Sequence, residues 1–75
     1  MKVDVVLFND RHIDPIIEVH TDPGVAIASA RAMGQEEATR YHQTLEERDI
    51  DGLLYYGAFS CEGDDVIVQE VDLTN

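Results

Sequence analysis

Two short runs of alternating apolar and polar residues open the chain and predict two β-strands. Residues 2–8 (KVDVVLF) are rich in β-branched residues, and residues 16–20 (IIEVH) follow Pro15, which is tolerated at the start of a strand. The polar segment between them, NDRHID, is typical of a connection. Because side chains alternate across a strand, odd and even positions of each run point to opposite faces.

After the segment TDPG, small and apolar residues recur at helical spacing and predict one α-helix. Thr21 or Asp22 is expected to cap it, and Pro23 suits its first turn. Gly34 costs about 1 kcal/mol relative to alanine inside a helix, so we attribute it to close packing on a sheet, with a kink as the alternative. The stripe expected to face the core comprises Ile27, Ala30, Gly34, Ala38, Tyr41 and Leu45.

The last third of the chain predicts a β-hairpin. Residues 53–61 (LLYYGAFSC) and 66–73 (VIVQEVDL) have the composition of strands, and Gly63 in the turn EGDD suits a positive φ angle. The element order is therefore β-β-α-β-β within a single domain, residues 1–75. We predict an α+β fold in which a single helix packs on a four-stranded, mainly antiparallel sheet.

One helix covers one face of such a sheet, and the opposite face has too many apolar residues to be a solvent face. A sheet with one wet face usually alternates apolar and polar residues cleanly, and this one does not. A second copy of the chain is the simplest cover, because two sheets stack into a shared core. The predicted interface takes its residues from the following set: Val6, Phe8, Ile16, Val66, Val68 and one of Tyr55 and Tyr56.

The charge of the chain excludes several classes of partner. Sixteen Asp and Glu oppose five Lys and Arg, which gives a net charge of -11. Such a charge repels nucleic-acid phosphates and anionic membrane surfaces, so direct binding to either is not expected. A high-salt host, a basic partner or solubility alone would each account for the acidity.

The location of the protein is predicted from what the sequence contains. Its longest apolar runs are far shorter than the roughly 20 residues that span a membrane. Strand-like sequence directly after Met1 does not resemble a signal peptide. Cys61 is the single cysteine and is compatible with a reducing compartment or with a small buried side chain. We expect a cytoplasmic, soluble protein.

The loop FNDRHIDP is the strongest candidate for metal chemistry. Asp10, His12 and Asp14 alternate along an extended segment, and with His20 they could supply imidazole and carboxylate ligands for Zn²⁺ or Mn²⁺. Their spacing matches no established metal motif. Asn9 and Asp10 are also typical turn residues, so a structural connection is the favoured interpretation. No metal and no cofactor are therefore expected, and a metal-binding protein remains an alternative.

Catalysis has little support in the sequence. His42 and Cys61 could form a thiolate–imidazole pair, but no third group or oxyanion hole is indicated. The chain lacks a glycine-rich phosphate loop, a nucleophile elbow, a paired-cysteine motif and HExxH. We expect no enzymatic activity and no catalytic residue.

Acidic residues suggest a second kind of binding surface. A row of carboxylates could imitate a phosphate backbone and inhibit a basic nucleic-acid-binding protein, whereas a solvated surface is the simpler interpretation. The residues concerned are Glu36, Glu37, Glu46, Glu47, Asp49, Asp51, Glu62, Asp64 and Asp65.

Three segments, VVLFNDRHIDP, DIDGLLYYGAFSCEGDD and VIVQEV, resemble small acidic uncharacterised proteins of actinobacteria and their phages. The resemblance covers most of the chain and rests on the short motifs NDRH and SCEGD. It implies no activity and no site residue, but it favours an accessory or inhibitor protein that acts by binding. The sequence as a whole predicts a non-enzymatic protein-interaction module that forms a homodimer. An acidic DNA mimic and a metal-binding protein that uses the Asp10-His12-Asp14 loop are the alternatives.

Overall fold

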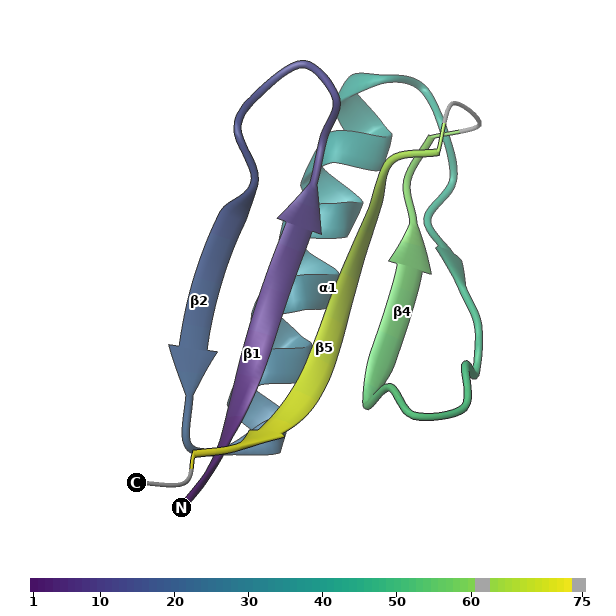
Figure 1. Ribbon diagram of the computed structural model, residues 1–75. Coiled ribbons are helices and arrows are strands. Elements are labelled where there is room, and N and C mark those ends of the chain that lie inside the picture. The colour runs from purple at the N-terminus through teal and green to yellow at the C-terminus, as the bar shows by residue number, and fades with distance from the viewer. Residues whose placement is uncertain (61–62, 74–75) are drawn as a thin grey trace.

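One α-helix lies across one face of a five-stranded antiparallel sheet in the computed structural model, which describes residues 1–60 and 63–73 (Figure 1). The strands lie in the spatial order β2-β1-β5-β4-β3. The helix packs mainly on the central strands β1 and β5. The elements in chain order are β1 (Lys2–Asn9), β2 (Ile16–His20), α1 (Pro23–Arg40), β3 (Glu46–Glu47), β4 (Tyr55–Ala58) and β5 (Asp65–Asp72).

The predicted α+β class, with one helix on an antiparallel sheet, is confirmed, but the strand count was wrong. The chain runs β-β-α-β-β-β, because the two-residue strand β3 pairs with β4 through Glu46–Ala58 and Glu47–Gly57. Two glutamates have no apolar alternation that could have revealed this strand. The third predicted strand is also shorter than residues 53–61, since β4 covers only Tyr55–Ala58.

The two ends of α1 differ in how well the sequence marked them. Asp22 is the N-cap, and its Oδ1 accepts hydrogen bonds from the backbone N–H of Gly24 at 2.8 Å and of Val25 at 3.4 Å. The helix ends at Arg40, earlier than a stripe reaching Leu45 implied. His42 has a φ of 57°, and the N–H groups of His42 and Gln43 donate to the carbonyls of Thr39 and Ala38. This is the Schellman arrangement, with histidine where glycine is usual.

Small residues on α1 allow the helix to approach the sheet closely. Ala30, Gly34 and Ala38 of the predicted stripe are buried against it, together with Ala26. A Cβ atom added to Gly34 would lie 2.9 Å from Leu45 Cδ1 and 3.2 Å from Val66 Cγ1. Close packing therefore explains this glycine. The core comprises these alanines together with Val6, Phe8, Tyr55, Phe59, Val66 and Val68.

The face assignment of the predicted interface was wrong. Val6, Phe8, Val66, Val68 and Tyr55 are buried beneath α1. Ile16 pairs with Phe8 in the register of β1 and β2, so it lies on the same side but is exposed at the sheet edge. Of the predicted interface residues, Tyr56 alone lies on the face opposite the helix. Both faces of the central strands are apolar, and alternation cannot tell which of them the helix covers.

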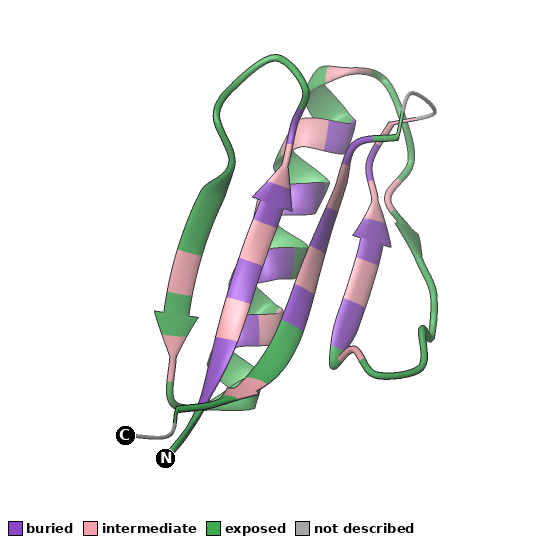
Figure 2. Cartoon of the chain, in the orientation of Figure 1, coloured by how far each residue is buried: buried purple, intermediate pink, exposed green. Residues whose placement is uncertain are grey.

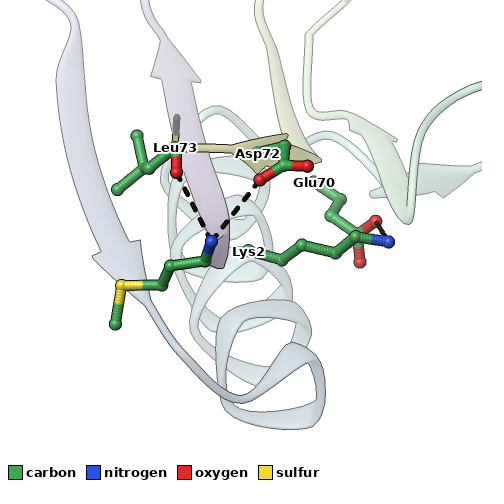
Figure 3. A network of polar contacts seen from close by, with 5 residues as sticks. Lys2, Glu70, Asp72 and Leu73 are labelled. Carbon is green, nitrogen blue, oxygen red and sulfur yellow. Dashed lines mark hydrogen bonds and ion pairs between the residues drawn. The ribbon is translucent and has the colours of Figure 1, made fainter. Parts of the chain in front are cut away.

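The first and last strands lie side by side, which brings the two ends of the described chain together (Figures 1 and 3). The amino group of Met1 lies 3.4 Å from the carbonyl oxygen of Leu73 and 3.6 Å from Asp72 Oδ1, and Lys2 Nζ lies 3.5 Å from Glu70 Oε1. These side chains are largely exposed, so the ion pairs contribute little to stability. Among the described residues, no helix has the length and apolar character needed to cross a membrane.

Candidate functional site

The face of the sheet opposite α1 carries an apolar row across four strands. Ile17, Leu7, Ile67 and Tyr56 are successive cross-strand partners on β2, β1, β5 and β4. Val19 and Val5 form a neighbouring pair on the same face. Figure 2 shows this side of the sheet, with half-buried positions alternating with buried ones along β1 and an exposed β2. We call the following residues the open face: Val5, Leu7, Ile17, Val19, Tyr56 and Ile67.

Exposure is highest at the β2 end of the open face. The side chains of Ile17 and Val19 remain 64% and 61% exposed, which is unusual for two neighbouring large apolar residues. The central partners Leu7 and Ile67 are half-buried by their strand neighbours. The open face is therefore an accessible apolar surface and not a second sealed core.

Among the described residues, charged side chains border the open face at Asp65, at Glu46 and at Arg48, which lies beside Tyr56. Asp65 lies opposite Asn9 and Ala58. Glu46 also lies opposite Ala58 and forms an ion pair with Arg48 at 3.2 Å. None of the six open-face residues is charged, although charged residues make up 28% of the chain. A neutral apolar surface within so acidic a protein is what an interaction surface requires, because carboxylates in its centre would oppose binding.

The loop FNDRHIDP is held by structural hydrogen bonds, which favours the turn interpretation. Asp10 is 5% exposed; its Oδ1 accepts from the backbone N–H of His12 at 2.9 Å, and its Oδ2 accepts from the Tyr41 hydroxyl at 3.2 Å. Asp64 Oδ1 accepts from the backbone N–H of Arg11 at 3.0 Å. The burial of Tyr41, together with the negative charge of Asp10, raises the pKa of the Tyr41 phenol. Asp10 thus ties the loop to the end of α1.

The predicted metal ligands are not brought together. His12 and Asp14 are exposed, whereas Asp10 is buried and bonded as described. Within residues 1–60 and 63–73, no three His, Cys, Asp or Glu side chains are grouped so that they could hold a metal ion. The alternative of a metal-binding loop therefore has no geometric support in this part of the chain.

A serine, a histidine and a glutamate do meet beneath the first half of α1. Glu18 Oε1 accepts from Ser29 Oγ at 2.6 Å and from His20 Nε2 at 2.9 Å. These two hydrogen bonds hold the pKa of Glu18 below its ordinary value, and the bond from Ser29 has the larger effect. The carboxylate accepts from both partners, so His20 is not placed to remove the proton of Ser29. The cluster joins β2 to α1 and is not a nucleophilic site.

The nine predicted acidic positions do not form a row of free carboxylates. Glu36 and Glu37 pair with Arg40, Glu46 pairs with Arg48, and Glu47 pairs with Arg31. Asp64 is buried, and Asp65 Oδ1 accepts from Asn9 Nδ2 at 3.1 Å. Glu62 lies outside the described residues. Of the predicted acidic residues that the structure describes, Asp49 and Asp51 alone make no hydrogen bond or ion pair within the described chain. The arrangement of these carboxylates therefore does not favour the mimic hypothesis.

An arginine, a glutamate and a tyrosine meet where α1 faces β3 and β4, a cluster that the sequence did not indicate. Glu47 Oε2 accepts from Arg31 Nε at 2.7 Å and from the Tyr55 hydroxyl at 2.6 Å, while the Arg31 guanidinium carbon lies 5.4 Å from the centre of the Tyr55 ring. Burial, and then the bond to Glu47, raises the pKa of Tyr55. The bond from Arg31, and then that from Tyr55, lowers the pKa of Glu47.

Replacing Tyr55 by phenylalanine is expected to lower the free energy of unfolding by about 1 kcal/mol near neutral pH, because the hydrogen bond to Glu47 is lost. A raised phenol pKa contributes stability below about pH 10, where the unfolded tyrosine begins to ionise, and this contribution is lost as the pH rises further. The difference between the two proteins should therefore shrink above about pH 10. Urea unfolding of both proteins, near neutral pH and above about pH 10, measures this difference in the free energy of unfolding.

Tyr56 to phenylalanine is the matched control for this experiment, since the Tyr56 hydroxyl makes no hydrogen bond within the described residues. It should leave the free energy of unfolding within about 0.5 kcal/mol of the wild type at both pH values. A Tyr55 variant that behaves like the Tyr56 control would contradict the role given to the Glu47 bond.

The other suggested site, His42 with Cys61, is not built by the described chain. His42 is exposed and terminates α1, and Cys61 lies outside the described residues. Comparison of the chain with protein-family models, with curated proteins and with solved structures finds no match. The open face is thus the feature from which a function can be proposed.

Proposed function

We propose that the protein is a non-enzymatic interaction module that self-associates by stacking its open face on that of a second copy. The observation that carries the proposal is the uncharged apolar row Ile17–Leu7–Ile67–Tyr56, which crosses four strands of a very acidic protein. Two sheets that stack in this way lie about 10 Å apart, and their inner side chains form a shared core.

The size of the chain supports the same arrangement. A 75-residue domain buries only about 60% of its unfolded surface, and small domains often gain stability from association. A twofold symmetric contact lets one apolar patch serve both copies. Repulsion between two chains of charge -11 opposes the dimer, so added salt should strengthen it.

Light scattering over a range of micromolar concentrations tests the proposal. The wild type should shift from the mass of one chain to that of two, at lower concentration in about 1 M NaCl than in about 0.1 M NaCl. The double variant Leu7→Thr, Ile17→Thr should raise the dissociation constant at least about tenfold, because each apolar loss occurs twice in a symmetric interface.

Val25→Thr is the matched control, since Val25 is an exposed β-branched residue on α1 and away from the open face. It should dimerise like the wild type. A wild type that stays monomeric at every concentration and salt level would overturn the proposal. Equal weakening by the control and by the open-face variant would overturn the assignment of the surface.

A further inference from the structure

A pocket of about 420 Å³ opens between α1 and the segment 48–54, which connects β3 to β4. Ile27 contributes from the helix, and Ile50, Leu53 and Leu54 contribute from the connection. The Tyr55 side chain lines it as well. The pocket shares Tyr56 with the open face, and its other lining residues lie outside that face. Its volume falls in the usual range for pockets that bind ligands, about 300–1,000 Å³.

The rim of the pocket presents apolar side chains to solvent. Ile50 and Leu54 remain 41% and 42% exposed, although both belong to a short connection that could have carried polar residues. Gly52 lies between them with a φ of 90°, and this left-handed conformation turns the connection back toward β4. An apolar side chain entering the pocket would cover Ile27, Ile50 and Leu53 together.

The unbalanced charge at the rim is negative. Arg31 is paired with Glu47 and Arg48 with Glu46, so both cations that line the pocket have an anionic partner. Asp49 lines the pocket and Asp51 follows Ile50, and neither has a partner within the described chain. An anionic ligand would have to compete with Glu47 for Arg31, against a net charge of -11. A cationic ligand meets two free carboxylates.

We propose that this pocket binds a short segment of a basic protein in which one aliphatic side chain is flanked by Lys or Arg. The aliphatic side chain enters between Ile27 and the connection, and the flanking cations face Asp49 and Asp51. Charge complementarity and the apolar lining select the same kind of occupant. This site can be tested apart from the proposed dimer, because Asp49 and Ile50 line the pocket and lie outside the open face.

NMR titration of isotope-labelled protein with three acetylated and amidated pentapeptides tests the proposal. The peptide AKLKA combines the leucine with two lysines, AKAKA keeps the charge without the leucine, and AELEA keeps the leucine with opposite charge. AKLKA should shift the backbone amide signals of residues 48–55 and bind at least about fivefold more tightly than either control peptide. Its advantage over AELEA should shrink between about 0.05 M and 0.5 M NaCl.

Protein variants separate the apolar contribution from the charge contribution. Ile50→Ser should bring AKLKA down to the affinity of AKAKA, and Asp49→Asn with Asp51→Asn should weaken both lysine peptides at low salt. Asp14→Asn with Glu36→Gln is the matched control, since it makes the same charge change at exposed positions outside the pocket lining. These two control substitutions should change the affinity for the lysine peptides by no more than about twofold.

The proposal is overturned if AKLKA and AKAKA bind equally, if AELEA binds best, or if the shifts spread over the whole acidic surface. It is also overturned if the control variant weakens binding as much as the pocket variant. Light scattering of the pocket variants keeps the two proposals apart: they should self-associate as the wild type does, whatever the outcome of the peptide titration.

Discussion

Phe59→Ala is expected to leave most of the chain unfolded at room temperature. Phe59 is fully buried and stacks on Phe8, with ring centres 5.0 Å apart and planes inclined by 7°. Removing a buried phenylalanine side chain costs about 3–5 kcal/mol, through lost burial and the cavity left behind. A core of this size supplies about 3–5 kcal/mol of net stability. Circular dichroism and guanidinium unfolding measure the loss.

Phe59→Leu provides the comparison for this variant. It keeps an apolar side chain at the site and should retain a cooperative transition, with a loss of about 1.5 kcal/mol. A Phe59→Ala protein whose cooperative transition moves by less than about 1 kcal/mol would contradict the position of this ring at the centre of the core.

Asp10→Ala is expected to lower the free energy of unfolding by about 2–4 kcal/mol. The substitution leaves the backbone N–H of His12 and the hydroxyl of Tyr41 without their acceptor, in a place where Asp10 itself is 5% exposed. Hydrogen bonds to a charged group contribute about 1.5–3 kcal/mol each, and an unpaired buried donor adds a penalty. Urea unfolding near neutral pH measures the change.

Asp10→Asn tests whether hydrogen bonding or charge carries this effect. Its Oδ1 can still accept from His12, so the expected loss is smaller, about 1 kcal/mol.

Zn²⁺ titration of the wild type decides between the structural and the metal interpretations of the loop. A bound metal at a hundredfold excess over its dissociation constant would add about 2.7 kcal/mol of stability. We expect Zn²⁺ not to raise the stability of the wild type. A rise in stability that Asp10→Ala abolishes would contradict a purely structural role.

Local patterns were reliable wherever the local chemistry is specific. The strands β1, β2 and β5 follow from alternating β-branched residues, and the positive φ of Gly63 follows from its position in the turn. The start of α1 follows from Asp22 and Pro23. These features depend on residues close together in the chain, so their cause can be read from the sequence.

Features that have no local sequence signal, or that depend on distant contacts, were missed or misplaced. The stop of α1 uses His42 in a left-handed conformation, which glycine usually adopts, so no stop signal was visible. Leu45 instead leaves the helix and packs where a Cβ atom on Gly34 or Gly57 would lie, which no periodicity shows. The cluster of Arg31, Glu47 and Tyr55 joins α1, β3 and β4, and these three residues also line the pocket. The apolar residues of the DIDGLL segment were the one available signal for that pocket.

One helix, an antiparallel sheet and two apolar sheet faces follow from the amino-acid pattern alone. The choice of the face that the helix covers follows only from how the helix docks on the folded sheet. Val6 and Phe8 meet Val68 and Val66 in register beneath the small residues of α1, so those even positions became the core. Leu7 and Ile17 were thereby left on the open face. The physical reason is that alternation is a local property, whereas helix docking depends on how whole surfaces fit together.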